Sequence, residues 1–301
     1  MGTFIGHVYP GLFLVSYGLY QALVVSKAVI VSDSLPNPSC PPRNKGRWAR
    51  LWGISYRGLL KMVTGSILVV YEISCIKGGL ILMDRELPPR FMYPKEWQHL
   101  TMFVLLALNG CVEVMSNNVL PQRCVLLEKG TVALTYYVLL MLLVSHVQGS
   151  AGVELQTHSL LILVTFLLML VLTIQLWAPD AVHLSLIETF LFLMMGSWLV
   201  QAGFILYRPV SGYPWQDDDI SDIMFITTFF CWHVMLNALC LLGIYSMASF
   251  WHRCHSPNWK LTGSTEAPYY TSPEGPVYEL LPEVEQSEKD EQALLLSESA
   301  P

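Results

Sequence analysis

Seven apolar stretches, each of about 20 residues or more, follow one another along this sequence. A helix of that length covers the hydrocarbon core of a bilayer, which is about 30 Å thick. Only 13% of the residues are charged, whereas a soluble globular domain has about a quarter. We therefore expect an all-α membrane protein, a bundle of seven transmembrane helices. The predicted spans are about Val8–Val31, Ile54–Cys75, Trp97–Leu120, Cys124–Val147, His158–Trp177, Val182–Tyr207 and Ile220–Phe250.

The C-terminal part differs from the rest in charge and composition. From Pro257 to the end there are nine acidic and two basic residues, against fourteen and fifteen in the preceding part, so the net charge of −6 belongs to the tail. This segment is rich in Ser, Pro and Glu and has few large apolar residues, which is typical of disorder. We predict a transmembrane domain at 1–252 and a disordered acidic tail at 253–301.

Basic residues favour one orientation in the membrane. Seven spans place the two termini on opposite sides, and the side of the C-terminus collects eleven Lys and Arg residues against five on the other. Because cytosolic loops are enriched in these residues, we expect a cytosolic tail and a luminal or extracellular N-terminus. The basic stretch Arg43–Arg50 would then contact anionic lipid headgroups.

Two short patterns in the tail resemble sorting signals. Tyr278 and Leu281 fit a Tyr-x-x-apolar pattern, and Asp290, Leu294 and Leu295 fit an acidic dileucine pattern. Adaptor proteins bind such segments in extended form on the cytosolic side. Both patterns are loose enough to arise by chance. They predict clathrin-adaptor partners and residence at the plasma membrane or in the Golgi and endosomal system.

Polar side chains interrupt the apolar helices. In the third span, His99, Asn109 and Glu113 form one stripe, because positions that are fourteen residues apart point within about 40° of each other. Such a stripe normally faces the interior of a bundle. The intramembrane polar residues singled out are Glu72, Asn109, Glu113, Gln201 and Asn237.

Histidines gather at one depth. With the orientation above, five of them share the luminal leaflet: His7, His99, His146, His158 and His233. One interpretation is a polar pocket that binds a metal ion or haem or handles protons, since imidazole suits all three. The other is that each histidine meets water or a neighbouring helix by itself at the membrane interface. Glu113 and His233 are the deepest, and Asn237, which lies one turn from His233 on the same helix face, is expected to orient its imidazole.

No pattern of a known catalytic centre is present. The last span of seven-span hydrolases carries His-x-x-x-His, whereas here His233 is followed by Asn237, and there is no Gly-rich phosphate loop or HExxH. We assign no catalytic residue and no cofactor, with a metal ion or haem as the alternative, and we do not expect an enzyme or a nucleic-acid partner.

Glycines recur seven residues apart, hence on one face of a helix. Small residues let helices approach closely in lipid, so these pairs predict helix–helix contacts. They are Gly11 and Gly18, Gly58 and Gly65, and Gly196 and Gly203.

Four motifs carry a resemblance to a known family. They are "GHVYPG" (Gly6–Gly11), "EWQH" (Glu96–His99), "GSWLVQAGFILYRP" (Gly196–Pro209) and "DDDISDIMFITTFFCWH" (Asp217–His233). In this order, over about residues 1–250, the chain resembles the transmembrane protein 45 family. The resemblance implies a multi-pass protein of the secretory or plasma membrane system whose biochemical activity is not established. Its motif residues here are His7, Trp97, Gln98, His99, Trp198, Gln201, Trp232 and His233.

The chain departs from that family at one place. The family has a dense His-x-His segment around the end of the fourth span and the start of the fifth, of which only His146 and His158 remain here.

The sequence as a whole leaves two hypotheses about function. The first is a binding, structural or trafficking role among membrane lipids, and the second is a metal-, haem- or proton-handling protein that uses the luminal histidines.

Overall fold

The computed structural model describes residues 3–31, 55–76, 79–84 and 88–255. Within these ranges it contains the seven expected helices, all long and apolar enough to cross a membrane, which confirms the predicted fold class. The helices are α1 (Phe4–Val31), α3 (Tyr56–Cys75), α4 (Pro94–Asn118), α5 (Val125–His146), α6 (Gly152–Ile174), α7 (Val182–Tyr207) and α8 (Ile220–His255). The sorting patterns, the basic stretch Arg43–Arg50 and most of the predicted tail lie outside the described residues.

The helix boundaries agree with the predicted spans to within three residues, except at two starts and at the end of α8, which continues to His255 rather than ending at Phe250. Helix α6 begins at Gly152 rather than at His158, and α1 begins at Phe4 rather than at Val8. The first turn of α6 contains the polar residue Glu154, which lowers the local hydropathy and therefore lies outside the predicted span. It is nevertheless helical, and its carboxylate pairs with Lys95 at 2.9 Å. As a result His7 and His158 lie within the first two turns of their helices rather than at the predicted starts of the spans.

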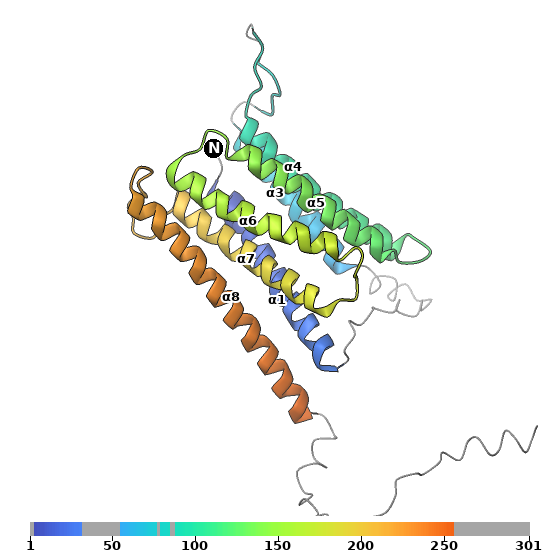
Figure 1. The fold of residues 1–301 in the computed structure, drawn as a ribbon. Coiled ribbons are helices and arrows are strands. Elements are labelled where there is room, and N and C mark those ends of the chain that lie inside the picture. The colour runs from blue at the N-terminus through green and yellow to red at the C-terminus, as the bar shows by residue number, and fades with distance from the viewer. Residues whose placement is uncertain (1–2, 32–54, 77–78, 85–87, 256–301) are drawn as a thin grey trace, which may run out of the picture. The chain divides into compact units, whose positions relative to one another are not determined.

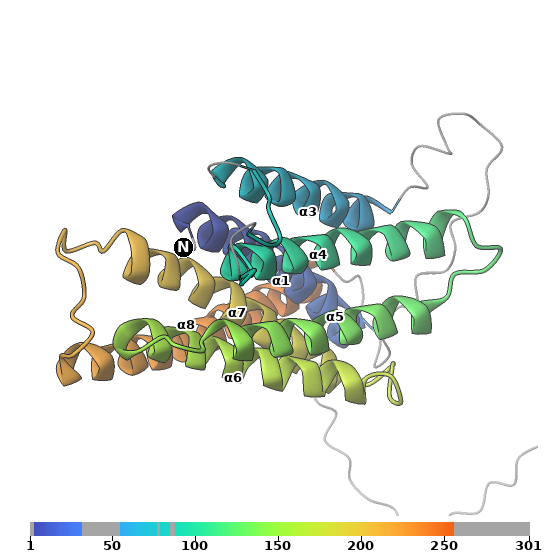
Figure 2. The same ribbon diagram turned by 90° about the horizontal axis from the view of Figure 1, so that it is seen from above.

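The helices pack in a series that leaves one side open. Helix α1 packs on α7, and the contacts continue through α6, α5 and α4 to α3 (Figure 2). Helix α8 lies outside this series against α1, α6 and α7 (Figure 1). The two ends of the series, α1 and α3, share no comparable packing surface among the described residues.

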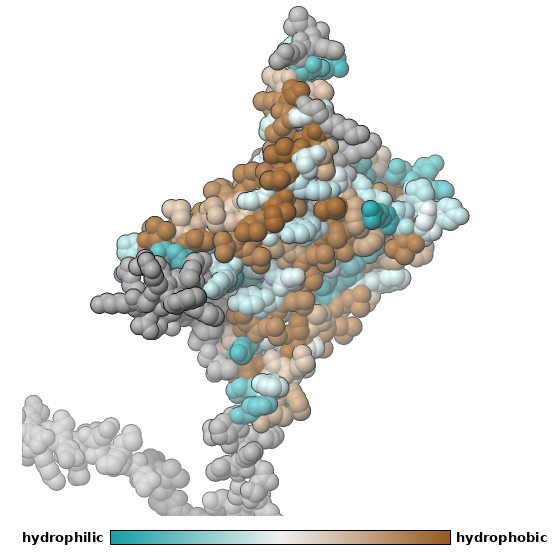
Figure 3. Space-filling model, turned by 180° about the vertical axis from the view of Figure 1, so that it is seen from behind, coloured by the Kyte–Doolittle hydropathy of each residue, from teal (hydrophilic) through white to brown (hydrophobic). Residues whose placement is uncertain are grey.

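The outer surface of the helices is apolar. Figure 3 shows hydrophobic side chains over much of the surface seen from that side. On α8 these include the exposed Leu236, Leu239 and Leu242, and on α5 the exposed Leu134 and Met141. Such surfaces are stable in contact with lipid tails, so the composition and the exposure pattern both fit a membrane-embedded bundle.

Glycines make the two tightest helix pairs possible. A Cβ atom added at Gly196 of α7 would lie 2.9 Å from the Gly11 carbonyl oxygen of α1, and one added at Gly110 of α4 would lie 2.5 Å from the Gly58 carbonyl oxygen of α3. Backbones touch at both places, which confirms the expected role of the glycines in packing.

We predict that Gly196→Val lowers the free energy of unfolding by about 1–3 kcal/mol, because the added atoms meet the backbone of α1. The matched control is Gly243→Val on α8, where a Cβ atom meets nothing within 4 Å. Thermal unfolding of the purified protein in detergent measures both. Equal transition temperatures for the two variants would show that the α1–α7 contact is not close.

Candidate functional site

Four histidines from four helices converge near the end of the bundle where α1 begins. We call this set the histidine ring; its members are His7 of α1, His99 of α4, His146 of α5 and His158 of α6. Neighbouring imidazole centres around the ring lie 5.1 to 6.3 Å apart. All four side chains are buried, with residue exposures between 3 and 8%. This convergence is what the pocket interpretation predicts, whereas the bonds to a neighbouring helix that the other interpretation predicts occur at His99 and His146.

Every imidazole of the ring is oriented by a hydrogen bond at Nδ1. The acceptors are the Thr3 carbonyl oxygen for His7 at 3.1 Å, Glu72 Oε1 for His99 at 3.0 Å, Gln98 Oε1 for His146 at 3.0 Å and the Glu154 carbonyl oxygen for His158 at 2.9 Å. Because each partner offers an oxygen acceptor, Nδ1 is the donor in each imidazole. In a neutral imidazole Nε2 then carries the lone pair, and within the described residues none of the four Nε2 atoms makes a hydrogen bond.

The histidine ring surrounds a small cavity of about 90 Å³. Its other lining residues are mostly apolar and include two thioethers, Met102 and Met195. This volume has room for one ion or a few water molecules, but not for a haem macrocycle. In the part of the chain that the structure describes, no three His, Cys, Asp or Glu side chains are already placed to share a metal ion.

Glu72 supports the ring from α3. Its carboxylate is almost completely buried at 2% exposure, and Oε1 accepts the hydrogen bond from His99. Its second oxygen, Oε2, is buried and has no hydrogen-bond partner among the described residues. An unpaired buried carboxylate oxygen is costly, so this position calls for an occupant or a proton.

His233, predicted with the other histidines, lies elsewhere. Its imidazole packs edge-on against Trp198, with ring centres 5.7 Å apart, and it does not line the small cavity. Asn237, expected to orient His233, instead donates to the His233 carbonyl oxygen at 2.8 Å and to Ser197 Oγ at 2.9 Å, which links α8 to α7. Gln201 is half-buried on α7 and makes no hydrogen bond within the described ranges.

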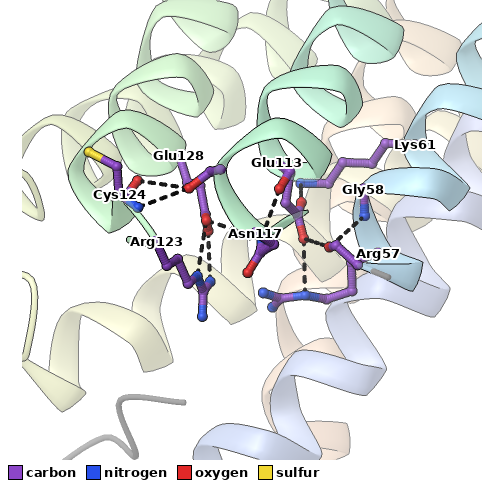
Figure 4. A network of polar contacts seen from close by, with 10 residues as sticks. Arg57, Gly58, Lys61, Glu113, Asn117, Arg123, Cys124 and Glu128 are labelled. Carbon is purple, nitrogen blue, oxygen red and sulfur yellow. Dashed lines mark hydrogen bonds and ion pairs between the residues drawn. The ribbon is translucent and has the colours of Figure 1, made fainter. Parts of the chain in front are cut away.

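Glu113 belongs to a different polar network, toward the opposite end of the bundle (Figure 4). Its carboxylate accepts hydrogen bonds from Lys61 Nζ at 2.9 Å and Ser55 Oγ at 3.1 Å, and Arg57 Nε lies 3.3 Å from Oε1. Beside it, Arg123 donates to both oxygens of Glu128 at 3.0 and 2.7 Å. Glu113 and His99 share a stripe on α4, as predicted, but they face different cavities.

A larger cavity of about 620 Å³ lies beside this network. Met102, Leu139 and Met195 line both cavities and form the wall between them. The buried side chain of Asn109 also lines the larger cavity. Of the five intramembrane residues that the sequence predicted, Asn109 and Glu113 line the large cavity and Glu72 contacts His99 behind the small one, whereas Gln201 and Asn237 line neither cavity.

Sequence reasoning missed the partner of Glu113. Lys61 lies five residues after the start of α3, and Glu113 five residues before the end of α4. Consecutive helices that run in opposite directions place these positions at one depth, so the opposite charges were a usable signal. The buried carboxylate of Glu188, which accepts a hydrogen bond from Gln175 Nε2 at 2.8 Å, was also missed.

Known proteins that match this chain over most or all of its length include three transmembrane epididymal proteins. The chain is 68% identical to transmembrane epididymal protein 1A of Mus musculus and 65% identical to transmembrane epididymal protein 1 of Rattus norvegicus, over 100% of this chain and 99% of each relative. It is 68% identical to transmembrane epididymal protein 1 of Homo sapiens, over 91% of this chain and 100% of the relative. A family model described as a family of unknown function (DUF716) matches residues 125–246.

We predict that Lys61→Met lowers the free energy of unfolding by about 1.5–3 kcal/mol, because the buried Glu113 carboxylate loses a charged donor. The double variant Lys61→Met with Glu113→Leu should recover part of this loss, because it also removes the buried carboxylate that lost its charged donor. Lys95→Met is the matched control. Its ion pair with Glu154 has side-chain exposures of 36 and 40%, so the change should stay within about 1 kcal/mol. Denaturation in mixed micelles measures all three, and a Lys61 effect no larger than the Lys95 effect would contradict the prediction.

Proposed function

Because this chain belongs to the family of the transmembrane epididymal proteins, membrane proteins whose names state no biochemical activity, we propose its activity from the site: it binds one transition-metal ion in the histidine ring. The observation that carries the proposal is the hydrogen-bond pattern that the four imidazoles share. Each Nδ1 is held by an acceptor, and this leaves each Nε2 available around one cavity.

The spacing of the ring supports coordination. A zinc–nitrogen bond of about 2.0–2.1 Å places the centre of a ligating imidazole about 3 Å from the ion, so tetrahedral ligands have ring centres about 5 Å apart. The observed neighbouring distances of 5.1 to 6.3 Å are close to that value. Four of the six imidazole pairs that a tetrahedral site brings together are thus already at about the required separation.

The acceptors that hydrogen-bond to Nδ1 of the four histidines are of the kinds found beside metal-binding histidines. Such histidines nearly always donate their other ring N–H to a carboxylate, a carbonyl or water, which fixes the ring and raises its basicity. Glu72 supplies the carboxylate behind His99, and its negative charge would partly offset that of a cation. Both residues of the sequence motif Gln98-His99 take part in the site. His99 is a member of the histidine ring, and Gln98 orients His146.

The two thioethers favour copper among the possible metals. Imidazole suits zinc, copper and iron alike, whereas thioether sulfur is a soft donor that selects Cu⁺. Met102 and Met195 line the same cavity as the four imidazoles. We therefore expect tighter binding of Cu⁺ than of Zn²⁺.

The setting of this site follows from the charge distribution and the relatives. The excess of basic residues on the side of the C-terminus supports a luminal or extracellular position for the histidine ring and a cytosolic tail. The names of the relatives support an epididymal tissue. The site would then take its ion from the lumen or from outside the cell.

We predict that the purified full-length protein binds one Cu⁺ per chain in competition with a chromogenic chelator. His99→Ala and His146→Ala should each abolish stoichiometric binding, and Glu72→Gln should weaken it about 10–100-fold, because the imidazole of His99 loses its carboxylate. Titration with Zn²⁺ in parallel, and with the Met102→Leu and Met195→Leu variants, measures the contribution of the thioethers.

The control for these titrations is His183→Ala, since His183 is exposed at the start of α7 and lies outside the ring. Unchanged affinity in His99→Ala, or equal loss in His183→Ala, would contradict the assignment. A purified wild-type protein that takes up neither ion would remove it.

Trafficking is proposed from the tail patterns and is tested independently. With Tyr278 and the Leu294–Leu295 pair replaced by Ala, the fraction of protein at the cell surface should rise, because adaptor-driven internalisation would be lost. Surface biotinylation measures this fraction, and tags at the two termini report on which side each lies. Unchanged surface levels would remove the adaptor hypothesis, and both tags on one side would remove the proposed orientation.

A further inference from the structure

The larger cavity has the size and shape of a ligand site. Its volume of about 620 Å³ falls within the range of about 300–1,000 Å³ that is typical of small-molecule pockets. Along α4 it extends from Met102 to Glu113, eleven residues apart, which corresponds to about 16 Å along the helix axis. The cavity is therefore elongated along the helices.

The cavity wall is apolar at one end and charged at the other. Toward the histidine ring, aromatic and aliphatic side chains line it, among them Phe13, Leu14, Leu105, Leu106 and Phe192. Toward the opposite end, the lining contains the polar network of Glu113 and the Arg123–Glu128 pair (Figure 4). A ligand that matches this wall has an apolar part and a polar head.

The charges of the wall balance each other. The basic lining residues are Arg57, Lys61, Arg123 and Lys129, and the acidic ones are Glu113, Glu128, Asp180 and Glu188. Two of the carboxylates already form ion pairs with three of the bases. Because four charges of each sign face the cavity, a head that carries a single net charge gains no preference there, whereas a zwitterionic head can contact both signs.

Asn109 offers a polar contact halfway along the cavity. Its side chain lines the cavity, its exposure is 6%, and it makes no hydrogen bond within the residues that the structure describes. Because this amide borders the cavity, an occupant that hydrogen-bonds to it would be stabilised.

The larger cavity lies at the open side of the helix series. Helices α1 and α3 both line the cavity but do not pack closely on each other. Between them Lys61 Nζ lies over the Tyr17 ring, 5.6 Å from its centre. A molecule dissolved in the membrane could enter by displacing such side chains, without separating packed helices.

We propose that the larger cavity binds a lipid-like amphiphile of the bilayer that has one apolar chain and a zwitterionic headgroup. The apolar chain lies among the aliphatic and aromatic side chains near Met102, and the head lies at the polar network around Glu113. This proposal does not rest on metal binding in the histidine ring.

The test uses the purified full-length protein with three single-chain probes: lysophosphatidylcholine, the anionic lysophosphatidic acid and a cationic long-chain amine. We expect one lysophosphatidylcholine per chain by native mass spectrometry, bound more tightly than the other two probes. Leu106→Trp fills the cavity and should weaken this binding at least about tenfold. Leu108→Trp on the same helix is the matched control, because Leu108 is 52% exposed on the outer surface.

A second variant keeps the test decisive if Leu106→Trp fails to fold. Asn109→Leu replaces a cavity-lining amide with an apolar side chain of similar size and should still fold, yet it should weaken probe binding several-fold. Equal binding by Leu106→Trp and Leu108→Trp, or tighter binding of either singly charged probe, would overturn the proposal. The His146→Ala variant should bind the probe as the wild type does, so this proposal and metal binding can fail independently.

Discussion

The high cost of placing polar groups in hydrocarbon governs this structure. A charged side chain at the centre of a transmembrane helix costs about 2.5–3.5 kcal/mol on insertion scales, and more when no partner is near. The buried carboxylates Glu72 and Glu113 both face the inside of the bundle, where each has a partner from another helix. Apolar side chains cover much of the outside, so the chemistry of this protein is gathered between its helices.

Two closely packed helix pairs set the positions of those interior groups. The backbone contact at Gly11 and Gly196 holds α1 on α7, and that at Gly58 and Gly110 holds α3 on α4. Helix α1 brings His7 to the histidine ring, while the second pair brings His99 together with the carboxylate behind it. Because Gly110 is one turn from Glu113, the same contact also places Lys61 within hydrogen-bonding distance of that carboxylate.

The two cavities are neighbours that differ in character. The small one offers lone pairs from buried imidazoles, and the large one offers an apolar wall with balanced charges at one end. Only the side chains of residues such as Met102, Leu139 and Met195 separate them. Methionine side chains are flexible and polarizable, so this wall can adjust its shape to an occupant on either side.

The sequence by itself determined the depth and direction of each polar group. Apolar length and a rise of about 1.5 Å per residue place the seven spans, including the boundaries of α7, and alternate directions place His7, His99, His146 and His158 at one end. Which groups meet was decided only by the tertiary structure: His233 packs on Trp198, and Glu113 pairs with Lys61 rather than approaching the histidines. The reason is physical, because hydropathy fixes where a residue lies along the membrane normal, whereas lateral neighbours depend on the close contacts between helices that are far apart in the chain.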